Sequence, residues 1–264
     1  MSQTEAITYS SYLKVPELLE LQQRKSRPEE HDEMLFIIIH QVYELWFKQM
    51  LHEGDHLKEQ LTHGADESAF ATVQRMLTIL KTMVSQVDIL ETMTPISFLS
   101  FRDFLQSASG FQSAQFREFE FLLGYKRARP IENYPEGSPE RVALQRRYAE
   151  PSIWNALCRW FRHRGFSVPS SLIDIDPTSP TEACPEFQPE LIRLYKEHPH
   201  ERALCENIVD LDEGIQEWRY RHVMMVQRTI GMRTGTGGSP GVDYLRGTLF
   251  NPLFPDLWAI RGEL

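Results

Sequence analysis

HEGDH, residues 52–56, carries residue types that could hold a catalytic metal ion. It fits the pattern H-E-x-x-H, which on a helix places two histidines on one face to bind zinc, beside a glutamate that can act as general base. At about 100° per residue, His52 and His56 share a polar face, and the apolar residues lie across the helix. A hydrolytic zinc site needs a third ligand, for which the sequence offers no evident candidate. We therefore favour a solvated polar face. On such a face Glu53 would have no water-excluding pocket in which to act as a general base.

The same stretch contains E-x-x-H, formed by Glu53 and His56, which is the spacing of di-iron carboxylate sites. Such a site needs a second E-x-x-H on another helix. The only other match runs from Glu197 to His200, and Pro199 spoils its helical geometry. The sequence does not support a di-iron site.

Two other histidines, His40 and His222, each lie alone on a predicted apolar helix face. By the helical count His40 shares its face with Phe36, and His222 has Trp218 and Met225 one turn to either side. One interpretation is a core histidine that hydrogen-bonds to the backbone. The other is an axial haem ligand, because haem needs one nitrogen donor inside a large apolar slot. Periodicity alone leaves both interpretations open.

Arg102 stands among apolar residues in FLSFRDFL, with Phe98 four residues earlier. A guanidinium in such surroundings needs an anion, and its forked geometry suits a carboxylate. That carboxylate belongs either to a ligand or to an internal acid such as Asp103. The glycine-rich segment RTGTGGSPG, residues 233–241, lacks the G-K-[ST] of a P-loop. It is typical either of a lid that closes over a ligand or of a plain solvent loop.

Helices are the elements expected to position these residues. Residues 33–62 are predicted to form one helix with Asp32 as its N-cap, and residues 66–92 form a second. Prolines predict irregular connections over 127–140 and 165–189. Almost no alternating strand pattern occurs, so the predicted fold class is all-α, a single helical bundle with long connections. Further helical segments are expected over 96–110, 113–123, 141–164 and 200–231.

The composition excludes several classes of function. The 264 residues suffice for a sizeable core. There are 28 Lys and Arg against 37 Asp and Glu, a formal net charge of −9, which argues against nucleic-acid binding. The longest apolar run, 34–39, is too short to cross a membrane, and no signal peptide is expected. The three cysteines form no C-x-x-C pair, so a reduced cytoplasmic location is expected.

Several separate blocks of this sequence, in the same order, resemble the haem-dependent tryptophan 2,3-dioxygenases nearly from end to end. The resemblance implies a haem b pocket between helices. It also implies insertion of both atoms of O2 across the indole C2–C3 bond of L-tryptophan, to give N-formylkynurenine, the first step of the kynurenine route. The blocks are TYSSYL (8–13), HDEMLFIIIHQVYELW (31–46), TPISFLSFRD (94–103), SGFQSAQFREFEFLLG (109–124), WRYRH (218–222) and GTGGSPGVDYL (235–245).

The resemblance also implies roles for the two lone histidines. His222 matches the axial ligand of the haem iron, and His40 matches the catalytic distal histidine near the indole N–H. Whether His40 removes the indole proton or only positions the ring is left open by the sequence. We favour positioning, because an indole N–H is far less acidic than imidazolium.

Substrate-binding roles follow from the same resemblance. Phe36 is expected to pack against the indole, and Arg102 to bind the substrate carboxylate. Thr236 is expected to bind the amino-acid end and order the glycine-rich loop, and Ser109 to lie near haem and substrate. Phe98 stands where certain members carry a tyrosine that also touches the carboxylate. The loss of that hydroxyl donor bears on affinity rather than on activity.

Tyr9 and Tyr12 match residues that the family lends to the pocket of a neighbouring subunit. The resemblance thus implies a homotetramer in which residues 1–30 form an N-terminal arm. Two rival functions remain at this point. One is a zinc hydrolase built on HEGDH, and the other is a helical haem carrier or interaction scaffold. A carrier requires neither the apolar surroundings of Arg102 nor a lid-like loop.

Overall fold

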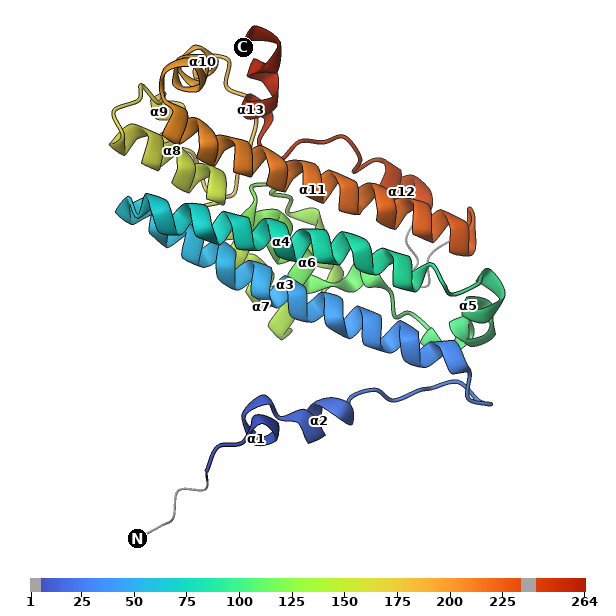
Figure 1. Ribbon diagram of the computed structural model, residues 1–264. Helices are drawn as coiled ribbons and strands as arrows, with labels where there is room; N and C mark the ends of the chain where they lie inside the picture. Colours follow the sequence, from blue (N-terminus) through green and yellow to red (C-terminus); the bar gives the residue numbers. More distant parts are fainter. Residues whose placement is uncertain (1–5, 234–240) are drawn as a thin grey trace.

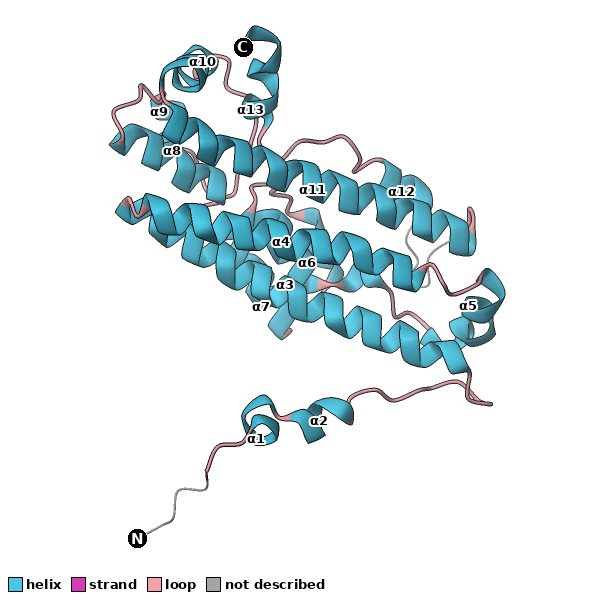
Figure 2. Cartoon of the chain, in the orientation of Figure 1, coloured by secondary structure: helices cyan, strands magenta, loops and turns pink. Residues whose placement is uncertain are grey.

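Three long helices form the frame of the molecule. The protein is described by a computed structural model over residues 6–233 and 241–264. Helices α3 (His31–His63), α4 (Asp66–Leu90) and α11 (Pro199–Ile230) lie side by side, and α4 packs against both of the others (Figure 1). Figure 2 shows helices joined by loops, and the described residues contain no strand. The predicted all-α bundle is confirmed.

Shorter helices cover the ends and one face of this frame. Helix α5 (Pro95–Arg102) lies at one end, and α8 (Ile153–His163) and α10 (Gln188–Glu197) lie at the other (Figure 1). Helix α6 (Ala114–Leu122) packs on α3, and α7 (Pro139–Ala149) packs on α6. The remaining elements are α1 (Tyr9–Leu13), α2 (Val15–Leu19), η1 (Asp103–Leu105), η2 (Gly110–Gln112), η3 (Arg129–Asn133), α9 (Ser170–Ile173), α12 (Val242–Arg246), α13 (Pro255–Ala259) and η4 (Ile260–Glu263).

The N-terminus of α3 differs from its prediction. Its N-cap is Glu30, whose backbone is extended (φ −93°, ψ 136°), so the expectation of Asp32 as N-cap was wrong. Asp32 lies in the first turn instead, where a negative charge favours the positive end of the helix dipole. At its other end the helix stops at Gly64, which takes the left-handed conformation (φ 67°) that glycine adopts without strain.

Pro151 divides the single helix predicted over 141–164. Helix α7 ends at Ala149 and α8 begins at Ile153, because proline lacks the N–H that a continuous helix would need and clashes with the preceding turn. The hydroxyl of Ser152 then caps α8 by accepting the backbone N–H of Asn155 at 3.2 Å. The connections at 127–140 and 165–189 likewise contain the short elements η3 and α9 rather than loop alone.

Glycines let the long helices approach closely. A Cβ atom at Gly54 would lie 2.4 Å from Cδ2 of Leu122, so this glycine sets the contact between α3 and α6. A Cβ atom at Gly214 would lie 2.6 Å from Cδ2 of Leu80, at the contact between α11 and α4. At contacts this short, a side chain at either glycine would have to displace a leucine methyl group in a close-packed interior. The glycine of the HEGDH stretch therefore has a packing role.

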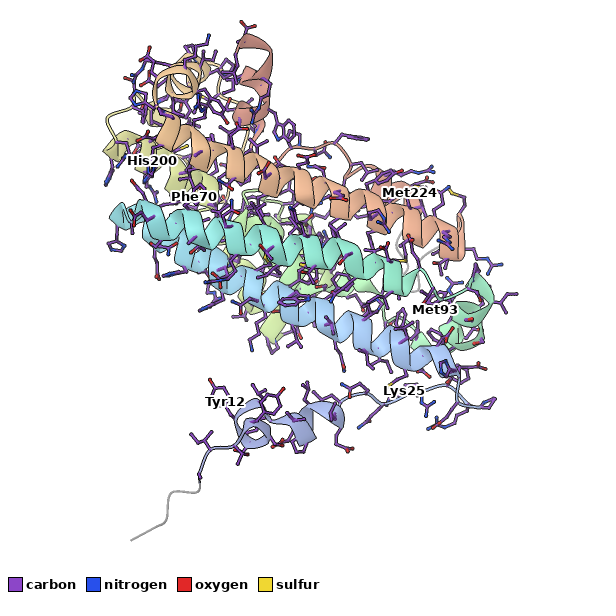
Figure 3. All side chains as sticks on the ribbon, viewed as in Figure 1. Tyr12, Lys25, Phe70, Met93, His200 and Met224 are labelled. Carbon is purple, nitrogen blue, oxygen red and sulfur yellow. The ribbon has the colours of Figure 1, made fainter. Side chains whose placement is uncertain are left out.

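The N-terminal arm lies apart from the bundle. In Figures 1 and 3, α1 and α2 run outside the body of the molecule, and Tyr12 lies on this separate segment. The arm is attached near residues 21–26, where the carboxylate of Glu33 accepts the backbone N–H groups of Lys25 (2.7 Å) and Ser26 (3.0 Å). Nothing in the described helices is long and apolar enough to cross a membrane.

Candidate active site

A large cavity opens between α3, α5, α6, α11 and α12. Its empty space is about 1690 Å³, a figure that includes open solvent at its mouth. Its walls are mostly aromatic and aliphatic. It brings together six of the residues expected from sequence, namely Phe36, His40, Phe98, Arg102, Ser109 and His222.

His40 on α3 has a defined protonation state. Its Nδ1 lies 2.7 Å from the carbonyl oxygen of Phe36, one helical turn earlier. A carbonyl oxygen can only accept, so Nδ1 carries the proton and donates it, which leaves Nε2 as the acceptor. Burial lowers the pKa of His40 below its ordinary 6.5, so the ring is neutral at pH 7. The side chain therefore offers the cavity one neutral nitrogen lone pair.

An aromatic cluster lies beside His40. The ring of Phe36 lies 4.1 Å from the imidazole, centroid to centroid, and 5.8 Å from the ring of Phe98. Phe101 is fully buried behind both and meets them edge to face, at 5.5 Å from each. Pairs at these distances prefer offset or edge contacts, which hold flat rings in fixed planes. This wall is shaped to receive another planar aromatic group.

His222 on α11 belongs to another wall of the same cavity. The residue is partly exposed, on the cavity side, and is otherwise surrounded by protein. Burial lowers the pKa of its imidazole to about 4. The imidazole is therefore neutral at physiological pH, which is the form that binds a metal ion. Its plane lies parallel to the indole of Trp218, within 1° and with centroids 5.3 Å apart.

The remaining substrate-binding candidates divide into three groups. Arg102, the last residue of α5, is half-buried at the cavity wall with Ser109 and Phe98. Helix α5 starts at Pro95 after Thr94, whose hydroxyl accepts the backbone N–H of Ser97 at 3.1 Å and so fixes the helix that carries Arg102. The expected contribution of Thr236 lies outside the described residues.

The two tyrosines of the arm do not reach this cavity. Tyr9 is 79% exposed and Tyr12 is 74% exposed, and neither lines the cavity of its own chain. Ile7 (80%) and Leu19 (68%) on the same arm are also exposed. Apolar side chains in such number on a segment outside the body are typical of an interaction site.

A buried charge cluster, which sequence reasoning missed, lines the same cavity. Glu120 is 2% exposed and accepts hydrogen bonds from Arg117 (2.7 Å), Arg127 (2.5 Å) and Arg219 (3.0 Å). Burial alone would raise the pKa of Glu120, but the three guanidinium groups outweigh it and lower that pKa. The helical spacing of Arg117 and Glu120 was visible in the sequence. Arg219 comes from α11, and no local pattern could reveal it.

The HEGDH stretch has no metal-binding geometry. His52 and His56 are exposed, as predicted, and Nε2 of His56 lies 2.9 Å from the side-chain amide of Gln60. The expectation for Glu53 was wrong, because this side chain is buried and pairs with Arg75 at 3.0 Å. Within the described ranges no group of three His, Cys, Asp or Glu side chains could hold a metal ion. The zinc hydrolase is therefore not supported.

The fold and cavity define a class of protein. A helical bundle that presents facing polar side chains inside an apolar space binds its ligand or cofactor between helices. This molecule has that architecture, with two neutral imidazoles and a guanidinium in one cavity.

Comparison with known proteins identifies the family. A family model described as tryptophan 2,3-dioxygenase matches residues 1–159 and 189–264. A tryptophan 2,3-dioxygenase of Herpetosiphon aurantiacus is 53% identical, over 99% of this chain and 100% of the relative. One from Anaeromyxobacter sp. (strain K) is 52% identical, over 98% of this chain and 97% of the relative. One from Arthrobacter sp. (strain FB24) is 41% identical, over 98% of this chain and 92% of the relative. The chain belongs to the tryptophan 2,3-dioxygenase family.

Proposed function

We propose that this enzyme inserts both atoms of O2 across the indole C2–C3 bond of L-tryptophan to give N-formylkynurenine. Membership of the tryptophan 2,3-dioxygenase family supports the reaction. The observation that carries the proposal for this chain is the arrangement of His40, His222 and Arg102 around one apolar cavity. That arrangement provides a metal ligand, a hydrogen-bond acceptor and a carboxylate-binding group, which are the three elements that an amino-acid dioxygenase needs.

The residues of the cavity fit haem b as cofactor. His222 supplies a neutral imidazole, the protonation state required of an axial ligand. The aromatic and aliphatic walls suit a flat apolar macrocycle. Haem supplies the activation of dioxygen when it is bound, and the protein contributes ligation, orientation and exclusion of water.

His40 orients the indole. With Nδ1 donating to the carbonyl oxygen of Phe36, the free Nε2 lone pair can accept the indole N–H. This hydrogen bond, together with the ring of Phe36 against the indole, fixes one end of the substrate. Because His40 is neutral and the indole N–H is a very weak acid, positioning rather than proton removal is the role that the geometry favours.

Arg102 holds the other end of the substrate. Its guanidinium binds the carboxylate of L-tryptophan in a forked contact. Phe98 at this wall offers no hydroxyl donor, so the carboxylate depends on Arg102, with Thr236 proposed to contribute at the amino-acid end. Ser109 is proposed to lie near the cofactor and the substrate. Fixing both ends of the substrate holds the indole in a reactive position, which is a large part of catalysis.

The working assembly is proposed to be a homotetramer. In it the arm, residues 1–30, places Tyr9 and Tyr12 at the pocket of a neighbouring subunit. The exposure of both tyrosines, and of Ile7 and Leu19 beside them, supports this arrangement. Under this proposal residues 1–264 form a single all-helical haem-binding catalytic domain, of which residues 1–30 are the arm. A cytoplasmic location remains a prediction, which fractionation of cells tests.

Tryptophan-dependent oxygen uptake tests the function. The haem-loaded protein should consume one O2 for each N-formylkynurenine formed, and Arg102→Ala should abolish most of this consumption at low substrate. Bound haem without tryptophan-dependent uptake, together with tolerance of Arg102→Ala, would favour a haem carrier instead.

A further inference from the structure

The imidazole of His222 is supported by the indole of Trp218, one turn earlier in α11. Their centroids lie 5.3 Å apart, and their planes differ by 1°. The spacing i, i+4 places both side chains on one face of the helix, so a single stretch of backbone carries the ligand and its support. Parallel rings at this separation form an offset stack, an arrangement that aromatic pairs prefer.

A stacking contact constrains the orientation of His222. A histidine that ligates a metal almost always donates its second ring N–H to a carboxylate, a carbonyl or water, which fixes the plane of the ring. For His222 the structure shows a ring contact, the parallel stack on Trp218. His40 differs, because its Nδ1 is bonded to the backbone. Packing against Trp218 therefore constrains the plane of the His222 ring.

Trp218 is itself held by rings from two other helices. Phe116 of α6 lies 5.0 Å away, and Phe47 of α3 meets it edge to face at 6.1 Å. Tyr43 of α3 makes a second edge contact at 6.2 Å. The hydroxyl of Tyr43 donates to the carbonyl oxygen of Met83 in α4 at 2.7 Å, which stops the tyrosine ring from shifting. Rings from α3 and α6 thus hold the indole that α11 carries, and one of these rings is anchored to α4.

We infer that Trp218 is a positioning residue for the axial histidine. Its indole sets the ring plane of His222, and with it the direction in which the imidazole would face the haem iron. This inference rests on the proposed function, in which His222 ligates haem. An aromatic stack of this kind favours its preferred geometry by about 3- to 10-fold over an aliphatic neighbour.

Imidazole rescue tests the inference without relying on activity. His222→Gly, loaded with haem, is titrated with free imidazole, and the dissociation constant is read from the Soret band. The titration is repeated with Trp218→Leu, with Trp218→Phe and, as a matched control, with Trp154→Leu added to the same background. Trp154 is a buried tryptophan that packs against Phe254 and does not line this cavity, whereas Trp218 is partly buried.

The expected result is a dissociation constant about 3- to 10-fold larger with Trp218→Leu, most of which Trp218→Phe restores. Trp154→Leu should leave it unchanged. Equal imidazole affinity in all four proteins would overturn the role of Trp218. If the parent protein binds haem but His222→Gly does not respond to imidazole, the axial role of His222 fails, and the inference fails with it. Failure of the role of Trp218 and failure of the role of His222 therefore give different results.

A second measurement covers the case in which the double variants do not fold. The iron–histidine stretching band of the reduced protein is recorded by resonance Raman for the single variants Trp218→Phe and Trp218→Leu. The leucine variant should shift or broaden this band, because the imidazole samples several planes, and the phenylalanine variant should keep it close to the parent band. A band unchanged by Trp218→Leu would contradict the inference.

Discussion

Nδ1 of His40 lies 2.7 Å from the carbonyl oxygen of Phe36, so the residue that packs beside the imidazole also fixes its tautomer. The bond assigns the proton to Nδ1 and leaves Nε2 free for the substrate. Because burial lowers the pKa of His40, the ring does not gain a second proton at neutral pH. The chemistry available to His40 is thus set by one backbone contact within α3.

His40→Ala should weaken substrate binding without abolishing turnover. Losing one neutral hydrogen bond to the indole should raise KM for L-tryptophan by about 2- to 12-fold. Steady-state kinetics on the haem-loaded variant measures this directly. A variant that bound substrate normally but had no turnover would show that His40 removes a proton instead.

Arg102→Ala should act on the carboxylate of the substrate alone. The loss of a charge-assisted contact should weaken L-tryptophan binding by about 10- to 150-fold. Tryptamine, which lacks the carboxylate, should bind parent and variant alike. Dissociation constants of L-tryptophan and tryptamine for both proteins test this prediction. An equal loss of affinity for tryptamine would mean that the substitution damages the cavity.

Glu120 should make stability sensitive to acid. Its buried carboxylate has a pKa lowered below the ordinary 4.5 by its three arginine partners, so the folded state holds fewer protons than the unfolded chain below that pH. This contribution is present above pH 4.5 and is lost as the pH falls through the folded pKa. Thermal unfolding followed over acidic pH should show the loss.

Glu120→Gln supplies the control for that titration. The variant should be less stable by about 3–5 kcal/mol at pH 7, because buried guanidinium groups lose their partner. Its melting temperature should then fall less steeply with acid than that of the parent protein. Parallel pH curves would show that other carboxylates cause the acid sensitivity.

Gly54→Val tests whether HEGDH is a packing element. The added side chain meets Leu122 and should lower the free energy of unfolding by about 1–3 kcal/mol. His52→Ala, at an exposed position two residues away, should change it by less than about 0.5 kcal/mol. Urea unfolding of both variants gives the comparison. Loss of activity in His52→Ala, together with stoichiometric zinc in the parent protein, would support the zinc hydrolase interpretation instead.

Co-expression tests whether the arm enters a neighbouring pocket. Tyr12→Ala and Arg102→Ala chains should each have low activity alone. In mixed tetramers, a chain with an intact Arg102 can receive an intact Tyr12 from its neighbour, so activity should reappear. Activity no greater than the average of the two variants would contradict an exchanged arm.

Local patterns were enough to predict most of the fold. Periodic apolar residues located α3, α4 and α11 to within a few residues, because amphipathic spacing is a property of short sequence windows. The helix boundaries were predicted wrongly where a single residue determines the start or the end of a helix. Pro151 broke a predicted helix, and Glu30 rather than Asp32 took the capping conformation.

The cavity was only partly predictable. His40, Arg102 and His222 could be singled out, since each is a polar side chain on an apolar face. Their convergence depends on packing between α3, α5 and α11, which no local window contains. Trp218 looked like one more core residue, and its parallel stack on His222 depends on rings from three helices.

The most direct test is the visible absorption spectrum of the reduced protein, recorded before and after addition of L-tryptophan. The account predicts a Soret band that shifts on addition, because haem and substrate share one cavity. His222→Ala should lose or displace that band, and Arg102→Ala should need more tryptophan for the same shift. A protein that stays colourless and inactive when haem is supplied would contradict the account.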